Sequence, residues 1–483
     1  MGAIIAVADK QNANAFDAAA TMLETLSHRG NDSFDVASPD KIVRKSNLRE
    51  LRKESVDSDI IIGHNIAEII PTDKTQPTRY RDLTLVLHGR LFPISMKTRL
   101  NTVLEQRTLL EKKAKNLIVS HNGAYAFAIA KENRIVVGRD AVGGVPLYFG
   151  ENKNFCTVAT EKKALWKIGI TNTRSFPPGT LALVNKSGFF FETVKNITQP
   201  QLQQSDMETT AKRLKEVLLR STRQCVSDTK RVAVAFSGGI DSSLIAYLAK
   251  LCNVEIDLIY VSLKGQKENA YVERVAKTLN LPFHHIIYSV NQIRECLPKV
   301  LWLIEEANPL MVSIAIPLFW VAEQSAKLGC HVLITGQGAD ELFGGYYRYL
   351  KNYARYGLAG LQRRLYKDVV SSYESNLERD DKACAFHKVE LRMPYTDWNV
   401  IQLGLSIPAG LKIFSRNDPL RKRILRFAAR KLGIPKFIAD KPKKAIQYAT
   451  GVNQEMRKLA KEEGLTLREY VEKTFLKIYG MLE

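Results

Sequence analysis

The pattern of hydrophobic positions is clearest over residues 231–249, which read RVAVAFSGGIDSSLIAYLA. The apolar run VAVAF predicts a buried strand, and the residues from Ile240 onward repeat apolar side chains at the period of a helix. Two glycines lie between the strand and the helix. This order favours an anion site, because backbone N–H groups and the helix N-terminus then face the bound oxygens. We therefore expect residues 237–243 to form a phosphate-binding loop.

Helical and strand patterns alternate along the second half of the chain. Periodicity predicts helices at 209–227, 240–249, 268–281 and 313–328, and strands beginning at 231 and spanning 255–263, 282–290 and 331–336. Such alternation is typical of a doubly wound parallel sheet, in which ligands bind at the carboxyl ends of the strands. The predicted fold class of this half is α/β.

The first half of the chain has a different pattern, rich in strands. Strands are expected at the N-terminus and at 82–89, a hairpin over 124–140 that turns at Glu132-Asn133, and a helix over 16–26. A polar, glutamine-rich stretch follows. We therefore predict one domain over 1–188, a linker over 189–208 and a second domain over 209–483.

Composition adds the broad class of the protein. The 483 residues are 45% apolar and 25% charged, as in ordinary globular proteins. No apolar run approaches the roughly 18 residues of a membrane span, and no basic segment precedes the apolar N-terminus as in a signal peptide. The six cysteines are scattered among apolar residues without paired spacing, which indicates reduced thiols and neither disulfides nor a zinc site. We expect a cytoplasmic protein without membrane association.

The formal charge of +21 needs an explanation of its own. Residues 409–483 contain 18 Lys and Arg against 8 Asp and Glu, so +10 of the charge lies there, most densely in 421–433. Three explanations stay open: a generally basic proteome, electrostatic steering of ATP and an anionic substrate, or binding of RNA.

The chemistry of the loop at 237–243 begins with its carboxylate. A carboxylate beside bound phosphate is costly unless a cation bridges them, so Asp241 is read as a magnesium ligand. The loop lacks the lysine and the spacing of a Walker A loop. It resembles the SGGxDSS pyrophosphate loop of ATP pyrophosphatases, which adenylate a substrate and release pyrophosphate.

The stretch GQGADELFGGYYRY at 336–349 resembles the GEGxDExFGGY motif of asparagine synthetase. The resemblance implies that Asp340 shares the magnesium with Asp241, and Gly336 and Gly338 admit the phosphates. Glu341 is expected to hold the loop rather than to bind metal. Nucleotide contacts are assigned to Ser237, Gly238, Gly239, Asp241, Ser242, Ser243, Leu263, Gly336 and Lys422.

Further motifs of the same family follow toward the C-terminus. RDD at 379–381 and HKVELRMPYTDW from 387 resemble a segment in which we read Glu390, Arg392 and Asp397 as a buried ionic scaffold. KPKKAIQY from 441 places Lys443 on the family lysine that lies over the α- and β-phosphates. A mobile ammonium there neutralises charge as pyrophosphate departs.

The first half resembles the class II glutamine amidotransferase domain through SHRGNDS, QPT, GAYAFAIA and RDAVGGVPLYFG. The resemblance implies a four-layer αββα fold of the N-terminal nucleophile type. Its nucleophilic cysteine corresponds to Gly2, its carboxylate-binding arginine to Ile66, and its oxyanion Asn-Gly pair to His88-Gly89. Because all three changed together, we expect a retained scaffold without glutaminase activity.

Two departures concern the synthetase reaction itself. Gln337 stands where asparagine synthetase has a glutamate that takes a proton from ammonia, and an amide cannot serve as that base. Ser313 stands where an arginine engages aspartate, which argues against free aspartate as the acceptor. The pattern is closer to the asparagine synthetase domain-containing branch than to the main synthetases.

The sequence thus predicts an AMP-forming amide ligase that uses ATP and Mg²⁺. Its expected partners are a small-molecule carboxylate and either ammonia or an amine, with Lys443 and Gln337 at the reacting groups. An adenylating enzyme that modifies RNA and a non-catalytic nucleotide-binding protein remain alternatives, and a homodimer stays open.

Overall fold

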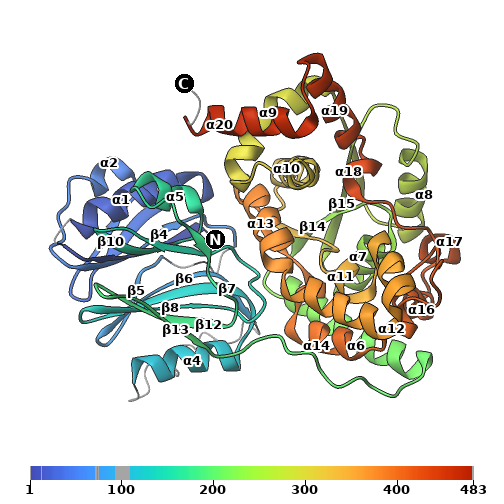
Figure 1. Ribbon diagram of the computed structural model, residues 1–483, viewed down its shortest axis with the longest axis horizontal. Helices are drawn as coiled ribbons and strands as arrows, with labels where there is room; N and C mark the ends of the chain where they lie inside the picture. The colour runs from blue at the N-terminus through green and yellow to red at the C-terminus, as the bar shows by residue number, and fades with distance from the viewer. Residues whose placement is uncertain (1, 12–13, 71–72, 74, 93–108, 481–483) are drawn as a thin grey trace. The chain divides into compact units, whose positions relative to one another are not determined.

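The computed structural model describes residues 2–11, 14–70, 73, 75–92 and 109–480. The chain separates into two compact units, Met1–Ile197 and Thr198–Glu483 (Figure 1). We call them the N-terminal and the C-terminal unit and describe each by itself.

Two antiparallel sheets form the centre of the N-terminal unit. Within the described residues, one sheet has seven strands in the order β11-β9-β10-β1-β4-β2-β3 and the other has six in the order β13-β12-β8-β7-β6-β5. The first contains β1 (Gly2–Asp9), β2 (Ser33–Ala37), β3 (Ile42–Lys45), β4 (Ile60–Ile66), β9 (Tyr148–Glu151), β10 (Phe155–Ala159) and β11 (Arg174–Ser175). The second contains β5 (Thr78–Tyr80), β6 (Leu83–Phe92), β7 (Asn122–Lys131), β8 (Arg134–Arg139), β12 (Thr180–Asn185) and β13 (Gly188–Thr193).

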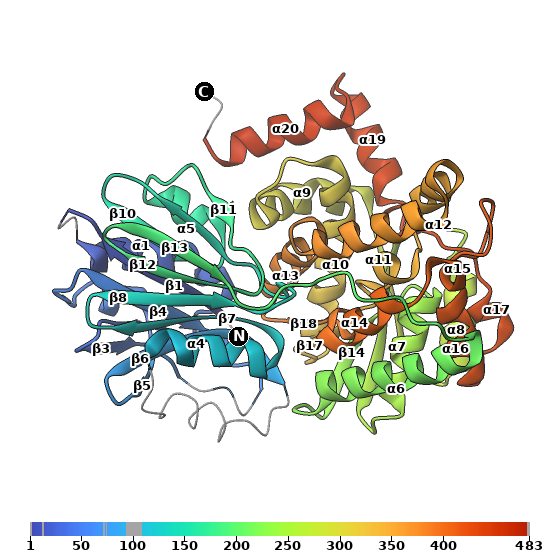
Figure 2. The ribbon, with the colours of Figure 1, turned by 60° about the horizontal axis from the view of Figure 1, so that its bottom comes forward.

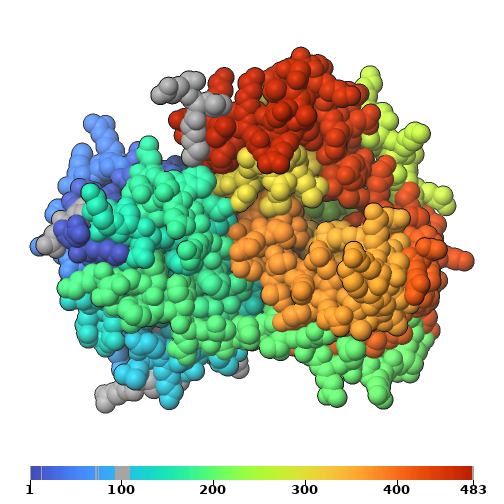
Figure 3. Space-filling model, in the orientation of Figure 1, coloured from blue at the N-terminus to red at the C-terminus, as the bar shows by residue number. Residues whose placement is uncertain are grey.

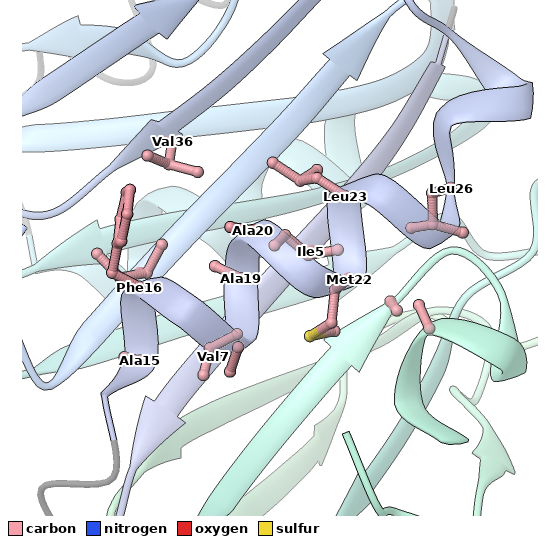
Figure 4. Packing of buried hydrophobic residues seen from close by; sticks show 14 of the residues in the cluster. Ile5, Val7, Ala15, Phe16, Ala19, Ala20, Met22, Leu23, Leu26 and Val36 are labelled. Atoms are coloured by element: carbon pink, nitrogen blue, oxygen red, sulfur yellow. The ribbon is translucent and has the colours of Figure 1, made fainter. Parts of the chain in front are cut away.

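Helices cover the outer faces of both sheets. The helices of this unit are α1 (Ala15–Thr25), α2 (Leu48–Leu51), α4 (Leu110–Ser120) and α5 (Lys162–Lys167). Phe16 and Leu23 of α1 pack on Ile5 and Val7 of β1, as Figure 4 shows. Helix α4 packs on the outer face of the six-stranded sheet, and small side chains such as Ala6 fill the space between the sheets. The predicted four-layer αββα fold is confirmed.

The predicted linker differs from the structure at its N-terminal end. Residues 189–193 continue β13, which pairs with β12 along its whole length. Phe189 and Phe191 project to one side, where their rings contact the ring of Phe149 at 5.2 and 4.8 Å between centroids. Aromatic packing of this kind stabilises the edge strand of a sheet. Residues 189–193 of the predicted linker therefore belong to the ordered strand β13.

The C-terminal unit is built on a parallel sheet in the order β16-β15-β14-β17-β18. These strands are β14 (Arg231–Ala235), β15 (Glu255–Leu263), β16 (Phe283–Tyr288), β17 (Val332–Ile334) and β18 (Glu390–Arg392). Helices α10 and α13 lie on one side of the sheet and α6 and α7 on the other (Figure 2). The predicted doubly wound α/β fold is confirmed.

The helices of this unit begin and end close to the predicted bounds where the periodicity is strong. They are α6 (Met207–Val226), α7 (Ile240–Lys250), α8 (Asn269–Leu279), α9 (Val290–Ile304), α10 (Pro309–Lys327), α11 (Ala339–Phe343), α12 (Tyr347–Val370), α13 (Glu378–Ala385), α14 (Trp398–Ser406), α15 (Ala409–Lys412), α16 (Arg423–Lys431), α17 (Lys436–Ala439), α18 (Ile446–Ala449), α19 (Val452–Glu462) and α20 (Leu467–Ile478). The long helix predicted from 313 begins earlier, because Asn308 caps its N-terminus through two backbone N–H groups.

Helix α10 is also the one helix in the described part of the chain that is long and apolar enough to cross a membrane. In the structure 61% of its apolar window is buried, and it packs against α9, α13 and β15. The helix at the centre of a globular core passes the same test of length and composition, so its hydrophobicity is explained by its place in the fold.

Candidate functional site

The predicted phosphate loop connects β14 to α7 at the carboxyl end of the sheet. Gly238 has a φ of 66°, in the left-handed region that favours glycine. The Ser242 hydroxyl accepts the backbone N–H of Ser237 at 3.2 Å and donates to the Gly239 carbonyl at 3.3 Å. The Ser243 hydroxyl is buried, and no hydrogen-bond partner for it is found within the described residues. An unsatisfied hydroxyl at a helix N-terminus suits a bound anion.

The GQGADELFGG segment forms the second loop, between β17 and α11. A Cβ on Gly336 would lie 2.8 Å from the Cβ of Asp241. A residue with a side chain at position 336 would therefore push the two loops apart, and glycine lets them approach closely. Gln337 is half-buried in this loop, and its backbone N–H faces the Thr335 hydroxyl at 3.4 Å. The neighbouring strands β14 and β17 therefore bring the two predicted motifs together.

Two carboxylates and two ammonium groups meet where the loops converge. The Nζ atom of Lys422 lies 2.6 Å from Asp241 and 2.5 Å from Asp340, and the Nζ atom of Lys443 lies 2.5 Å from Asp340 and 3.9 Å from Asp241. We call these four residues the ionic centre. All four were predicted as site residues, and they come from four separate segments of the chain.

The protonation states follow from these contacts. Burial favours the neutral form of Asp340, but Lys422 and Lys443 outweigh it and hold the pKa of this carboxyl well below its usual range. Burial likewise lowers the pKa of Lys443, and the facing carboxylates, Asp340 first, raise it above its ordinary value. Asp340 and Lys443 are therefore both ionised across the physiological pH range.

The position of Lys422 depends on an unusual stretch of backbone. Arg421 and Lys422 have φ values of 52° and 49°, two consecutive residues in the left-handed region. The Arg421 Nε atom donates to the Gly345 carbonyl at 2.9 Å, which ties this stretch to the second loop. A Cβ on Gly345 would lie 1.8 Å from Asp340 Oδ1 and 2.2 Å from Lys422 Cε. Gly345 thus leaves the room in which the two side chains meet.

Arg426, which the sequence pattern did not reveal, organises the loop that carries Lys443. Its guanidinium is buried and donates to the carbonyls of Leu420, Ala439 and Lys441. A signal for Arg426 was nevertheless present, because it is a charged residue of helix α16 whose neighbours are buried. Arginine is rarely enclosed without specific partners. By fixing the backbone on both sides of the loop, Arg426 sets where Lys443 can reach.

Tyr271 is a second residue that the sequence did not reveal. Its hydroxyl lies 3.4 Å from the carbonyl of Gly238 and the ammonium of Lys441 lies 4.0 Å above its ring. Tyr271 therefore links the phosphate loop to the segment that contains Lys443.

The remaining residues of the sequence motifs form hydrogen bonds and ion pairs with other protein groups. Glu341 is buried, accepts from the Tyr346 hydroxyl and the Asn376 amide, and has a pKa raised by burial and by the neighbouring Asp340. Arg392 binds Glu390 at 2.7 Å and also contacts the carboxylate of Asp228.

Two more assigned residues lie away from the ionic centre. Asp397 accepts the backbone N–H of Asn399 at 2.8 Å and so caps α14. Leu263 ends β15, and its backbone N–H already donates to the Thr450 carbonyl at 2.9 Å. Among the contacts of the described residues, none joins Leu263 to the ionic centre.

The donor set fits a magnesium–nucleotide complex. Mg²⁺ is commonly bound by one or two carboxylates together with phosphate oxygens and water, and Asp241 and Asp340 supply such a pair. The ammonium groups of Lys422 and Lys443 supply donors for phosphate oxygens. Within the described residues no group of three or more His, Cys, Asp or Glu side chains could hold a metal by itself.

The positions that align with the amidotransferase centre lie in the N-terminal unit, and their residues differ from those of that domain family. A Cβ on Gly2, whose φ is 146°, would lie 1.8 Å from the Asn65 carbonyl oxygen. The Gly2 carbonyl accepts the Nε–H of Arg29 at 3.1 Å, and Arg29 also binds the buried carboxylate of Glu161 at 2.8 Å. His88 lies 3.4 Å from the same guanidinium. Residue 2 therefore lies in a backbone position that excludes a side chain.

Comparisons with known proteins agree with these observations. A sequence model described as Asparagine synthase matches residues 213–359 and 354–477, and one described as Glutamine amidotransferase domain matches residues 94–167. A Methanocaldococcus jannaschii protein that is provisionally named asparagine synthetase (glutamine-hydrolyzing) 1 is 29% identical over 92% of this chain and 93% of its own length. Asparagine synthetase B (glutamine-hydrolyzing) of Escherichia coli is 23% identical over 66% of this chain and 59% of its own length.

Solved structures overlap with parts of the chain. The glutamine phosphoribosylpyrophosphate amidotransferase of B. subtilis has a TM-score of 0.36 at 17% identity, covering 61% of this chain and 70% of that one. The NMN synthetase of Francisella tularensis has a TM-score of 0.29 at 12% identity, covering 58% of this chain and 94% of that one. These scores are too low to support an argument, whereas the match to the synthase family covers more than half of the sequence. The chain belongs to the asparagine synthase family.

Proposed function

We propose that this protein is an AMP-forming amide ligase of asparagine synthetase type that does not hydrolyse glutamine. The observation that carries the proposal is the ionic centre, where Asp241, Asp340, Lys422 and Lys443 meet beside the glycine loop at the carboxyl ends of β14 and β17. Carboxylates that bind a cation, next to ammonium groups and a glycine loop at a helix N-terminus, suit the triphosphate of ATP.

The reaction has two steps. A carboxylate oxygen of the acceptor attacks the α-phosphorus of ATP, the bond to the bridging oxygen of pyrophosphate breaks, and an acyl-adenylate forms. Ammonia or an amine then attacks the acyl carbon, AMP leaves with the former carboxylate oxygen, and the proton that the nitrogen loses goes to water. A bound Mg²⁺ supplies charge neutralisation of the phosphates.

Lys443 has the role of compensating charge on the departing pyrophosphate. The side chain of Lys443 is 25% exposed, whereas that of Lys422 is 1% exposed. The more accessible lysine is the one that can turn toward phosphate oxygens, and Lys422 keeps Asp241 and Asp340 together. Gln337 lies in the loop beside them and offers an amide, which orients a nucleophile but takes no proton.

The nitrogen source in this proposal is free ammonia or an amine substrate. The relatives named above are called glutamine-hydrolyzing, yet Gly2 provides no nucleophile, and its backbone leaves no space for one. Ile66, at the position we align with the carboxylate-binding arginine, is a buried residue of β4. Incubation with glutamine should therefore give no glutamate above background, and sustained glutamate release would overturn this part of the proposal.

The acceptor is proposed to be a carboxylate other than free aspartate. Ser313, which aligns with the aspartate-binding arginine, is completely buried in α10 and donates to the Leu310 carbonyl at 2.9 Å. A serine engaged with its own helix cannot form the bidentate contact that recognises a carboxylate.

An ATP–pyrophosphate exchange screen across aspartate, other amino acids and total RNA tests the proposal. We expect exchange with a carboxylate compound, dependent on Mg²⁺, and AMP as the nucleotide product when an amine is added. Release of ADP with any acceptor, or exchange that persists in Asp241→Ala, would overturn it. Exchange with RNA alone would favour the alternative of an adenylating enzyme that modifies RNA.

A further inference from the structure

The basic C-terminal segment 421–433 is largely used inside the protein. Lys422 and Arg426 have exposures of 0% and 1% and hold the ionic centre and its loop. Arg423 binds the carboxylate of Asp418 at 2.7 Å. Lys422, Arg423 and Arg426 are therefore engaged within the protein. The exposed Arg430 and Lys431 face the carboxylates of Asp440 at 3.7 Å and Glu208 at 2.9 Å, so the densest basic stretch of the sequence carries little unpaired charge.

A different helix presents the unpaired charge. Helix α12 carries exposed basic side chains along its length, namely Arg348, Lys351, Arg355, Arg363, Arg364 and Lys367. Asp368 is its only acidic residue. The carboxylate of Asp368 is bound by Arg348 at 2.9 Å and by Arg364 at 3.0 Å. Among the described residues, no acidic partner is found for Lys351, Arg355, Arg363 and Lys367.

Exposed aromatic rings are interleaved with these cations. The side chains of Tyr347 and Tyr356 are 65% and 53% exposed. The Lys351 ammonium lies 5.7 Å from the ring centre of Tyr347, and the Arg355 guanidinium lies 5.0 Å from that of Tyr356. Each tyrosine thus stands beside a cation on the surface, an arrangement that offers both a stacking platform and a phosphate ligand.

The helix is long and divided into two segments. Gly357 has non-helical angles, φ 66° and ψ −169°, and separates one segment with Lys351 and Arg355 from another with Arg363 and Lys367. At the rise of an α-helix, Lys351 and Lys367 are separated by roughly 24 Å along the chain axis, less the effect of the kink. The surface that contains α12 is visible in light orange in Figure 3.

We propose that α12 is a binding surface for single-stranded RNA. Its unpaired cations are Lys351, Arg355, Arg363 and Lys367, and Tyr347 and Tyr356 are its stacking residues. Phosphate binding accounts for the cations, and stacking of unpaired bases accounts for the exposed rings. An acidic protein surface would engage the same cations but would leave the two ring faces without a role. RNA is the partner in which charged backbone and accessible bases occur together in loops and ends.

Binding should respond to salt in a way set by these cations. Release of counterions from a single strand gives a slope of log K against log salt of about −0.7 per neutralised phosphate, so four contacts give about −3. Loss of the four cations should remove most of this slope, whereas loss of the tyrosines should weaken binding and leave the slope nearly unchanged.

The test is fluorescence anisotropy of a labelled single-stranded RNA oligonucleotide of mixed sequence with the full-length protein. The cation variant changes Lys351, Arg355, Arg363 and Lys367 to Gln. Its matched control changes Lys458, Lys461, Lys473 and Lys477 to Gln, four exposed lysines on α19 and α20 that lie among acidic residues, so both variants lose the same net charge. We expect the cation variant to bind at least 10-fold more weakly and the control to bind like the unmodified protein.

A second variant separates RNA from other polyanions. Tyr347→Ala together with Tyr356→Ala should weaken the RNA several-fold and leave heparin binding unchanged. Equal loss in the cation variant and its control would show a general charge effect and overturn the proposal. No effect of the tyrosine variant on RNA would overturn the assignment to single strands and leave an acidic macromolecule as the partner. These readouts need no catalytic turnover, so the proposal fails or holds independently of the ligase reaction.

Discussion

The Nζ atom of Lys422 lies 2.7 and 2.6 Å from the two carboxylate oxygens of Asp241, although the residues are separated by 181 positions. Lys422 thereby places a positive charge against both oxygens of the carboxylate that we assign to the metal. Lys443 adds a second ammonium beside Asp340, so that two positive charges face two carboxylates. This pairing explains how two carboxylates can lie close together in an enclosed position.

Replacement of Lys443 by Met should remove catalysis while the fold is retained. We expect exchange to fall about 100-fold or more, the typical effect of removing a group that stabilises developing charge. The rate is measured by ATP–pyrophosphate exchange with the acceptor found in the screen, and ATP affinity by calorimetry, which needs no acceptor. Lys444→Met is the matched control, since Lys444 is 43% exposed and pairs with Glu268 at 3.3 Å. Comparable losses in both variants would contradict the role of Lys443.

A methyl group at residue 345 should disturb the ionic centre directly. The Cβ introduced by Gly345→Ala would lie 1.8 Å from Asp340 Oδ1, so the carboxylate and Lys422 must separate. We expect weaker ATP binding and a loss of stability of about 1–3 kcal/mol, the usual cost of forced overpacking. Gly410→Ala is the control, because the nearest atom to its Cβ would be 3.7 Å away. Calorimetric ATP titrations and melting temperatures of the two variants decide the matter, and unaltered ATP binding by the Gly345→Ala variant would speak against the proposed crowding.

Introducing a cysteine at residue 2 should not restore glutamine hydrolysis. The Cβ introduced by Gly2→Cys would overlap the Asn65 carbonyl oxygen at 1.8 Å, so β1 must shift to accept it. We expect no glutamate release and a lower melting temperature. Gly2→Ala has the same Cβ without the thiol and should be destabilised to the same extent. Glutamine turnover by the cysteine variant would show that the site is intact except for its nucleophile.

The buried amine of Lys412 should make stability depend on alkaline pH. Burial lowers the pKa of Lys412 to about 7, and its Nζ atom has no hydrogen-bond partner among the residues that the structure describes. Between about pH 7 and 10.4, the unfolded chain binds the proton that the folded protein lacks, so stability rises as pH increases through this range. Lys412→Met should stabilise the protein near pH 7 by a few kcal/mol and flatten the rise. Urea unfolding from pH 7 to pH 10 measures both effects, and an unchanged pH slope in the variant would contradict the burial of a neutral amine.

The extent to which the fold could be predicted depended on how local each signal was. The hairpin turning at Glu132-Asn133 was found because alternation of apolar residues and a turn lie within one short stretch. Strand β18 was not predicted from the sequence. It has only three residues, and two of them, Glu390 and Arg392, are charged, which is not the pattern of a buried strand. Its charges are tolerated because they bind each other and Asp228, which no local pattern reveals.

The site was predictable where the residue types are themselves the signal. The glycines and hydroxyls of the loop at 237–243 specify a phosphate site from a single segment. Arg426 and Tyr271 were missed because an arginine and a tyrosine on helices most often lie at the surface or in the core. Their function as supports of the loops exists only through carbonyl groups that distant segments bring to them.

The sequence by itself determined the two fold classes through local patterns of apolar residues. It also predicts the phosphate loop and shows directly that Gly2 has no side chain. The tertiary structure alone decided that Lys422 lies between two carboxylates, and that four cations of α12 are exposed without an acidic partner among the described residues. Parallel strands place their carboxyl ends side by side whatever the length of chain between them, and burial follows from packing. Charge pairing and exposure are therefore properties of the folded chain, and no single segment contains them.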